Sequence, residues 1–187
     1  FINTELAATS DRIRFPTTLD RYTHLQGIIK NAASSNITLT ADQRARVDKE
    51  LAKVSSRLRP QDVLPTALRG QFTQAFTNLA RRPKLLPNNQ PALNNAGNPV
   101  YIEPTATEVA LFASDVSKNI ARLNPDLDKA DIERIAKETM AGLPQFSKIA
   151  KTANLKDQVI EGTDKAVVEQ KVESASWNAR IDETPNR

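Results

Sequence analysis

The sequence predicts an all-α protein in which about six helices form two three-helix bundles. Its composition is one reason: only 5 of 187 residues are glycine and 5% are aromatic, whereas helix-favouring Ala, Leu, Lys, Arg, Glu and Gln are abundant. The other is periodicity, because apolar residues recur at helical spacing on both sides of a proline-rich break at residues 83–104. We expect one domain, residues 1–187, with helical halves at residues 17–82 and 105–181.

The first half contains three expected helices, after a short helix within residues 1–14. The first begins at Pro16–Thr18, and its apolar face is Leu19, Tyr22, Leu25, Ile28 and Ile29. The second begins at a Thr40–Gln43 capping box and ends at Pro60, and its apolar stripe is Val47, Leu51, Val54 and Leu58. The third has Pro65 in its first turn and ends at Arg81–Pro83, and its stripe is Leu68, Phe72, Phe76 and Leu79. We expect Phe72 and Phe76 to lie in the core.

The second half repeats this organisation. A Thr105–Glu108 capping box begins a helix that ends at Asn124–Pro125, with apolar residues Val109, Phe112, Val116, Ile120 and Leu123. The acidic residues Asp126, Asp128 and Asp131 are expected to cap the next helix, because the glycine and distal Glu of a calcium loop do not follow them. That helix is expected to end at Gly142–Pro144. A short helix near residues 146–153 and a last one from Thr163 complete the prediction.

The break at residues 83–104 holds five of the 11 prolines, which exclude a helix. Long loops inside compact domains are uncommon, and they are usually either functional or disordered. One interpretation of this break is therefore a flexible linker. Apolar residues and turn chemistry favour the other, a shaped loop with a short β-hairpin that is presented on the helical body. The apolar residues are Leu85, Leu86, Leu93 and the run 100–102, and the turn segment is 94–99.

Several classes of chemistry lack the residues they need. With a single histidine, His24, and no cysteine, the sequence offers no metal site, disulfide or thiolate nucleophile. No nucleotide-binding glycine motif is present, so we expect no cofactor and no covalent catalysis. No run is long enough for a membrane span. Residues 42–84 carry ten basic and four acidic residues. The basic residues are interleaved with Asp48 and Glu50, and no aromatic residue available for stacking on bases lies among them, so nucleic-acid binding is not expected. A monomer is expected.

The order of three helices, a proline-broken segment and three further helices resembles the SopE/BopE-type bacterial guanine-nucleotide exchange factors. The segment Ala96-Gly97-Asn98-Pro99-Val100-Tyr101 is similar to the family's catalytic loop, and Leu68–Arg82 followed by Leu85–Pro87 is similar to its third helix and exit. The family's Gly-Ala-Gly-Ala core is replaced by Asn95–Asn98. The related Trp-x-x-x-Glu motif is not matched, since Ile181 stands four residues after Trp177.

The resemblance implies a secreted effector that acts in the host cytoplasm on a Rho-family GTPase. Its loop would insert between the two switch segments and release GDP without covalent chemistry. The implied exchange residues are Asn95, Ala96, Gly97 and Asn98, and the implied partner-binding residues are Asn94, Pro99, Val100 and Tyr101. The alternative is a non-catalytic helical scaffold or adaptor that binds another protein partner.

Overall fold

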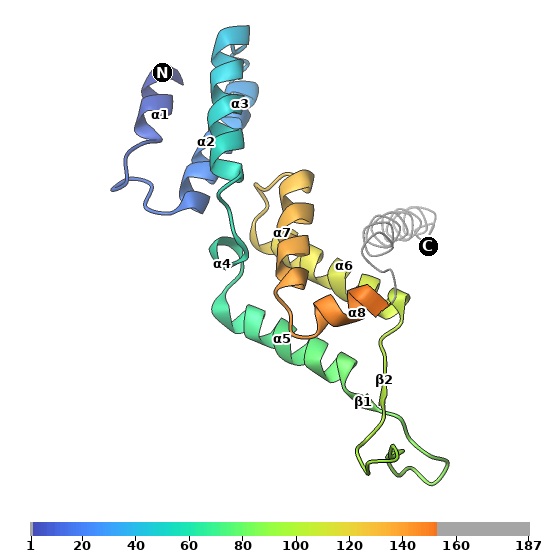
Figure 1. Ribbon diagram of the computed structural model, residues 1–187. Helices are drawn as coiled ribbons and strands as arrows, with labels where there is room; N and C mark the ends of the chain where they lie inside the picture. Colours follow the sequence, from blue (N-terminus) through green and yellow to red (C-terminus); the bar gives the residue numbers. More distant parts are fainter. Residues whose placement is uncertain (1, 153–187) are drawn as a thin grey trace, which may run out of the picture. The chain divides into compact units, whose positions relative to one another are not determined.

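The computed structural model describes residues 2–152 and confirms the all-α class (Figure 1). The described part has eight helices and one two-stranded antiparallel sheet. The helices are α1 (Ile2–Ala8), α2 (Thr18–Ser34), α3 (Ala41–Ser55), α4 (Pro60–Val63), α5 (Thr66–Ala80), α6 (Ala106–Leu123), α7 (Lys129–Ala141) and α8 (Phe146–Thr152). The strands are β1 (Arg82–Pro83) and β2 (Tyr101–Ile102). The helix expected from Thr163 lies outside the described residues.

Two compact units divide these elements. Among the described residues, the first comprises 2–68 and 119–138, and the second comprises 69–118 and 139–152. Each unit therefore takes segments from both sides of the 83–104 break, which differs from a division into halves 17–82 and 105–181. The boundary falls within α5, α6 and α7, so these helices contribute residues to both units.

Side-chain caps begin three of the long helices. Thr40 and Gln43 form the expected box at α3, and Thr105 and Glu108 form the expected one at α6. A further box, between Thr17 and Asp20, begins α2. Each pair satisfies amides of the first turn that have no partner within the helix. The helix starts expected at Thr40 and Thr105 are therefore confirmed.

The second expected helix was wrong at its end, because α3 stops at Ser55 and not at Pro60. Pro60 instead begins the short helix α4. Arg134 of α7 stabilises the earlier end by donating to the carbonyls of Ser55 (2.9 Å) and Leu58 (3.1 Å). Leu58 is fully buried, as its place in the apolar stripe predicted, although it lies beyond the helix.

Each unit has its own core. In the first unit the largest fully buried side chains are Tyr22, Leu25, Val47, Leu58, Leu64, Ile120 and Ile135. In the second unit four rings pack together: Phe112 lies edge-on to Phe72 and Phe76, with centroids 6.1 and 5.3 Å apart, and Phe146 lies 6.0 Å from Phe76. The core position expected for Phe72 and Phe76 is confirmed.

Candidate protein-binding site

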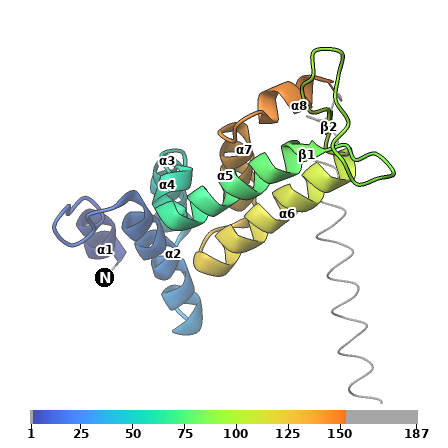
Figure 2. The same ribbon diagram turned by 90° about the horizontal axis from the view of Figure 1, so that it is seen from below.

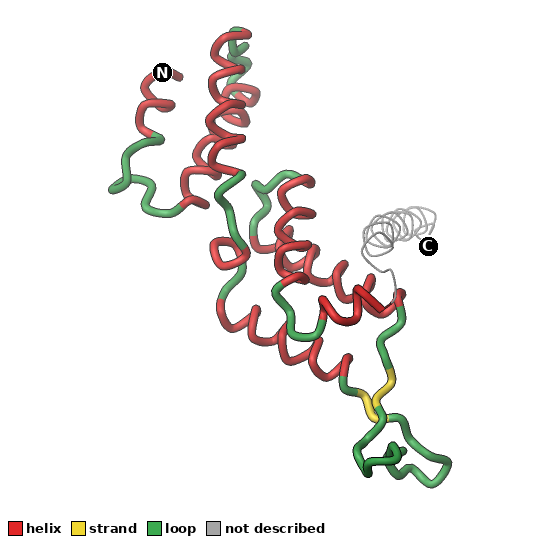
Figure 3. The backbone as a smooth tube through the Cα atoms, in the orientation of Figure 1, coloured by secondary structure: helices red, strands yellow, loops and turns green. Residues whose placement is uncertain are grey.

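Residues 82–102, which we call the double hairpin, form an ordered structure with two hairpins. Strands β1 and β2 pair antiparallel at its base, in the register Arg82 with Ile102 and Pro83 with Tyr101. Between them the chain makes two further antiparallel bridges, Leu85 with Pro91 and Leu93 with Pro99. The strands appear yellow in Figure 3, and Figure 2 shows two separate loops of chain beyond them. The expected short β-hairpin is thus present, and it is accompanied by a second turn.

The double hairpin is built from an eight-residue repeat that was not predicted from the sequence. The triplets Pro83-Lys84-Leu85, Pro91-Ala92-Leu93 and Pro99-Val100-Tyr101 have the pattern proline, variable residue, large apolar residue. Each apolar residue is paired with the proline of another triplet: Leu85 with Pro91, Leu93 with Pro99, and Tyr101 with Pro83. The three pairings therefore form a closed cycle, in which each triplet is paired with the other two.

The middle residues of the triplets form a ring of three backbone hydrogen bonds. Lys84 N–H donates to Val100 O (2.7 Å), Val100 N–H to Ala92 O (2.8 Å), and Ala92 N–H to Lys84 O (2.7 Å). Each residue thus donates once and accepts once. The ring holds the two hairpins and the base together through the main chain alone, which satisfies polar groups that a loose linker would leave to water.

Proline fits this ring because it occupies positions that need no donor. Leu85 and Pro91 are flanked by the bonds Ala92 N–H to Lys84 O and Leu86 N–H to Gln90 O, so they face each other without bonding directly. Such non-hydrogen-bonded pairs of an antiparallel ladder make no use of the missing proline N–H. The fixed φ of the proline ring also limits the conformations of the unfolded segment.

The two turns are equivalent as well. Leu86 N–H donates to Gln90 O (2.8 Å), and eight residues later Asn94 N–H donates to Asn98 O (2.8 Å). Left-handed backbone occurs at Asn89 (φ 60°) and at Gly97 (φ 77°), again eight residues apart. Asparagine and glycine are the residues that adopt this conformation most easily.

The predicted site residues lie on the second turn, and residues 94–99 are all exposed. The carboxamide oxygen of Asn94 accepts from the amides of Ala96 (2.9 Å) and Asn98 (3.0 Å), so this side chain shapes the turn. The side chains of Asn95 and Asn98 make no hydrogen bond to the part of the chain that the structure describes. Their amide groups are therefore available to a partner.

Exposed apolar side chains are concentrated on the double hairpin. Of nine large exposed hydrophobic residues within 2–152, five belong to it: Leu85, Leu86, Leu93, Tyr101 and Ile102. Val100, also predicted to bind a partner, is half-buried and is a member of the ring. The leucines were noted in the sequence only as apolar anchors of the loop, and the eight-residue spacing was the signal that could have placed them with Tyr101.

An ion pair joins the base of the double hairpin to α6. The guanidinium of Arg82 contacts both carboxylate oxygens of Glu108, at 2.7 and 2.8 Å. The Thr105 amide also donates to Glu108 (2.9 Å). These hydrogen bonds, first from the Thr105 backbone and then from Arg82, hold the pKa of the Glu108 carboxyl below its ordinary value. One carboxylate thus begins the helix and fixes the first strand.

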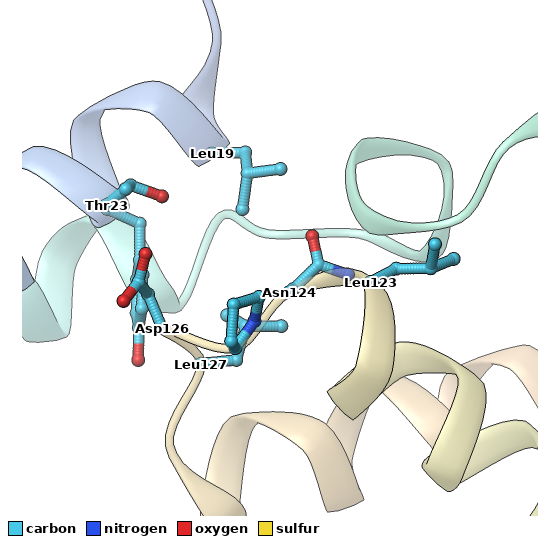
Figure 4. A pocket seen from close by; sticks show the side chains of 8 residues that line it. Leu19, Thr23, Leu123, Asn124, Asp126 and Leu127 are labelled. Atoms are coloured by element: carbon cyan, nitrogen blue, oxygen red, sulfur yellow. The ribbon is translucent and has the colours of Figure 1, made fainter.

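Other candidate sites are less suited to chemistry. A pocket of about 130 Å³ lies beside α2, lined by residues that include Leu19, Thr23, Asn124 and Asp126 (Figure 4). Asn124 donates to the carbonyls of Val63 and Ile120, and Asp126 pairs with Lys30. The side chains of Asn124 and Asp126 are therefore already engaged within the first unit.

His24 has a structural environment. Its ring stacks on Phe15, with centroids 4.2 Å apart, and its Nε2 lies 3.1 Å from the carbonyl oxygen of Glu5. These contacts join α2 to α1, through Glu5, and to the segment that follows α1, through Phe15. The Glu5 carboxylate lies 3.5 Å from the same nitrogen, and His24 is the single histidine of the sequence, so these contacts fix the ring against the N-terminal segment.

Basic residues of the region 42–84 are in part neutralised. Arg44 pairs with Asp48 (2.9 Å), Lys53 with Glu50 (3.6 Å) and Arg59 with Glu138 (3.4 Å).

No helix within residues 2–152 has both the length and the hydropathy that crossing a membrane requires. Comparison of the chain with protein-family models, curated proteins and solved structures gave no match.

Proposed function

We propose that this chain is a guanine-nucleotide exchange factor that displaces GDP from a Rho-family GTPase through the double hairpin. The observation that carries the proposal is an exposed turn, residues 94–99, held by a closed ring of backbone hydrogen bonds. A turn fixed in advance loses less conformational entropy on binding than a flexible loop, so more of its contact energy is available to favour the nucleotide-free partner.

The proposed mechanism requires binding and no bond chemistry. The turn inserts beside the nucleotide site of the GTPase and binds the nucleotide-free state more tightly than the GDP-bound state. By thermodynamic linkage, the same difference in affinity weakens GDP. The free carboxamides of Asn95 and Asn98 supply donors and acceptors for backbone groups of the GTPase. If the protein is a secreted effector, as the family resemblance implies, this reaction takes place in the host cytoplasm.

Release of a fluorescent GDP analogue from a panel of Rho-family GTPases tests the proposal. We expect the unmutated chain to accelerate release and Asn98→Ala to reduce that acceleration about tenfold, because a buried partner group would lose its hydrogen bond. Gln90→Ala is the matched control, since Gln90 holds the equivalent position in the first hairpin. No acceleration with any GTPase would rule the proposal out.

The second candidate is a non-catalytic adaptor, and the apolar side chains of the double hairpin favour it equally. Leu85, Leu93 and Tyr101 supply binding surface whether or not GDP leaves. An adaptor would bind a GTPase or another protein without changing the rate of GDP release. The same kinetic assay, combined with a direct binding measurement, separates the two candidates.

A further inference from the structure

The ring places three apolar side chains on one face of the double hairpin. Successive side chains of a strand point to opposite faces, so residues 85, 93 and 101 lie opposite to their ring neighbours 84, 92 and 100. Because the three pairings are equivalent around the ring, Leu85, Leu93 and Tyr101 all lie on the same side of it. Each has a proline directly opposite, and side chains at such paired positions are close neighbours.

This face, which we call the Leu–Tyr face, is accessible. The exposed fractions are 53% for Leu85, 60% for Leu93 and 50% for Tyr101. In a helical body, side chains of this size are normally buried, and here the ring could have been built with polar residues at these positions because main-chain groups close it. The hydrogen bonding of the ring therefore does not account for three large apolar residues at equivalent positions.

We propose that the Leu–Tyr face is a second partner-binding surface, which anchors the GTPase while the 94–99 turn displaces its nucleotide. This inference rests on the proposed function and names the chemistry of the partner surface. The partner is expected to offer an apolar, uncharged groove that covers Leu85, Leu93 and Tyr101. Apolar side chains buried at the centre of an interface supply most of its binding energy.

Charge defines the edge of the expected groove. Residues 85–102 contain no charged side chain, although 26% of the whole chain is charged. Arg81, Lys84 and Glu103, at the base of the double hairpin, are exposed and form no ion pair within residues 2–152. Two of these three charges are positive, so the base has an excess of one positive charge. A groove with acidic side chains at one edge would complement this pattern, and those pairs would set the association rate more than the affinity.

A protein suits this surface better than a lipid bilayer. The turns that flank the Leu–Tyr face carry amide side chains, which include Asn88, Asn89, Asn95 and Asn98. Burial of these groups in hydrocarbon would leave them without hydrogen-bond partners, at a cost of several kcal/mol each. Only two unpaired basic residues lie at the base, which is fewer than the polybasic segments that bind anionic membranes contain.

The two surfaces have separable effects on kinetics. Loss of the Leu–Tyr face weakens the bound state and the exchange transition state alike, so it raises the concentration of factor that gives half-maximal exchange. Loss of the turn contacts lowers the maximal rate of GDP release. The anchor and the displacing turn are therefore distinguished by which kinetic parameter changes.

The test uses Leu85→Ser combined with Leu93→Ser, compared with Leu111→Ser. Leu111 is the matched control because it is 55% exposed but lies on α6. We expect the double substitution to weaken binding to a nucleotide-free Rho-family GTPase about tenfold or more, and to leave the rate of GDP release at saturating factor within about twofold. Leu111→Ser should change neither quantity.

Three other results would overturn the inference. If the unmutated chain exchanges nucleotide and the double substitution leaves its affinity unchanged, the Leu–Tyr face is not an anchor and the proposed function stands. If the unmutated chain neither binds nor accelerates release, both proposals fall. If it sediments with phosphatidylserine–phosphatidylcholine vesicles and the double variant does not, the face binds lipid.

Discussion

The second compact unit contains two regions of opposite construction, the four-phenylalanine cluster and the double hairpin. In the cluster, packing of side chains holds the structure together: Phe72 and Phe76 are buried, and their rings contact the ring of Phe112. In the double hairpin, main-chain hydrogen bonds hold the structure together: Lys84, Ala92 and Val100 form a closed ring, while large apolar side chains stay exposed.

This difference separates stability from recognition. Burial of apolar side chains, the aromatic rings among them, favours folding of the unit. A loop whose shape depends on backbone bonds and proline does not need its side chains for internal packing. Those side chains are then free for a partner, which is how loops on a rigid scaffold often carry binding. Substitutions in the two regions should therefore have very different effects on unfolding.

The largest effect is expected in the phenylalanine cluster. Phe76→Ala removes a fully buried ring that contacts both Phe112 and Phe146. We expect the free energy of unfolding to fall by about 3–5 kcal/mol, from lost burial and the cavity left behind. Urea unfolding followed by circular dichroism measures it. A loss below about 1 kcal/mol would mean that the cluster is not the core of this unit.

Gly97 should be sensitive to the shape of the side chain that replaces it. A Cβ at this position would meet no atom within 4 Å, so the constraint is the φ of +77° and not space. Gly97→Val should strain the turn by about 1–2 kcal/mol, whereas Gly97→Asn should be tolerated, because Asn89 holds the same conformation in the first hairpin.

Amide hydrogen exchange of Asn94 and Val100 reports this strain. We expect protection to fall about 5–30-fold for Gly97→Val, as that strain implies, and to stay near the unmutated value for Gly97→Asn. Equal protection in the two variants would show that the left-handed turn does not determine the structure of the hairpin.

A smaller effect is expected at the Arg82–Glu108 contact, and it depends on pH. Because the folded-state pKa of Glu108 is lowered from 4.5, its contribution is present above that value and is lost as the pH falls through the folded-state pKa. Amide chemical shifts of Arg82 and Ile102, followed through an acid titration, should report loosening of the β1–β2 base. Glu108→Gln should show the loosened signals at neutral pH, and a titration that matches the unmutated chain would exclude this role.

The smallest effect on stability is expected on the Leu–Tyr face. Leu93→Ser removes an apolar side chain that is largely exposed already, so the free energy of unfolding should change by no more than about 0.5 kcal/mol. Urea unfolding again provides the measurement. A loss comparable to that of Phe76→Ala would show that the face is packed within the protein and is not available to a partner.

Helix positions were well predicted where the signal was local. The Thr40 and Thr105 caps, the end of α6 before Asn124 and the end of α7 before Gly142 depend on side chains a few residues apart. The end of α3 was not predictable in this way. It depends on Arg134, which is 79 residues beyond Ser55 and supplies the hydrogen bonds that a longer helix would have made.

The sequence predicted the location of the candidate site but not its backbone structure. Proline density and the Asn–Gly turn chemistry located an exposed loop correctly at residues 94–99. The hydrogen-bonded ring was not predicted, because it requires three segments of the chain to occupy equivalent positions. The sequence gives little sign of this, since only proline and a large apolar residue recur every eight residues. As a result Leu85 and Leu93 were not grouped with Tyr101. Their equivalence is evident only from the structure, where each of the three residues is paired with a proline.

The closed ring also has a consequence for the evolution of the segment. Surface loops generally accept insertions and deletions at little cost. Here a duplicated octapeptide would add a fourth member to a ring of three, and a deleted one would leave one donor and one acceptor without a partner. A change in length by a whole repeat should therefore destabilise the segment, and we expect variation among related sequences to be concentrated at the tips, residues 87–90 and 95–98.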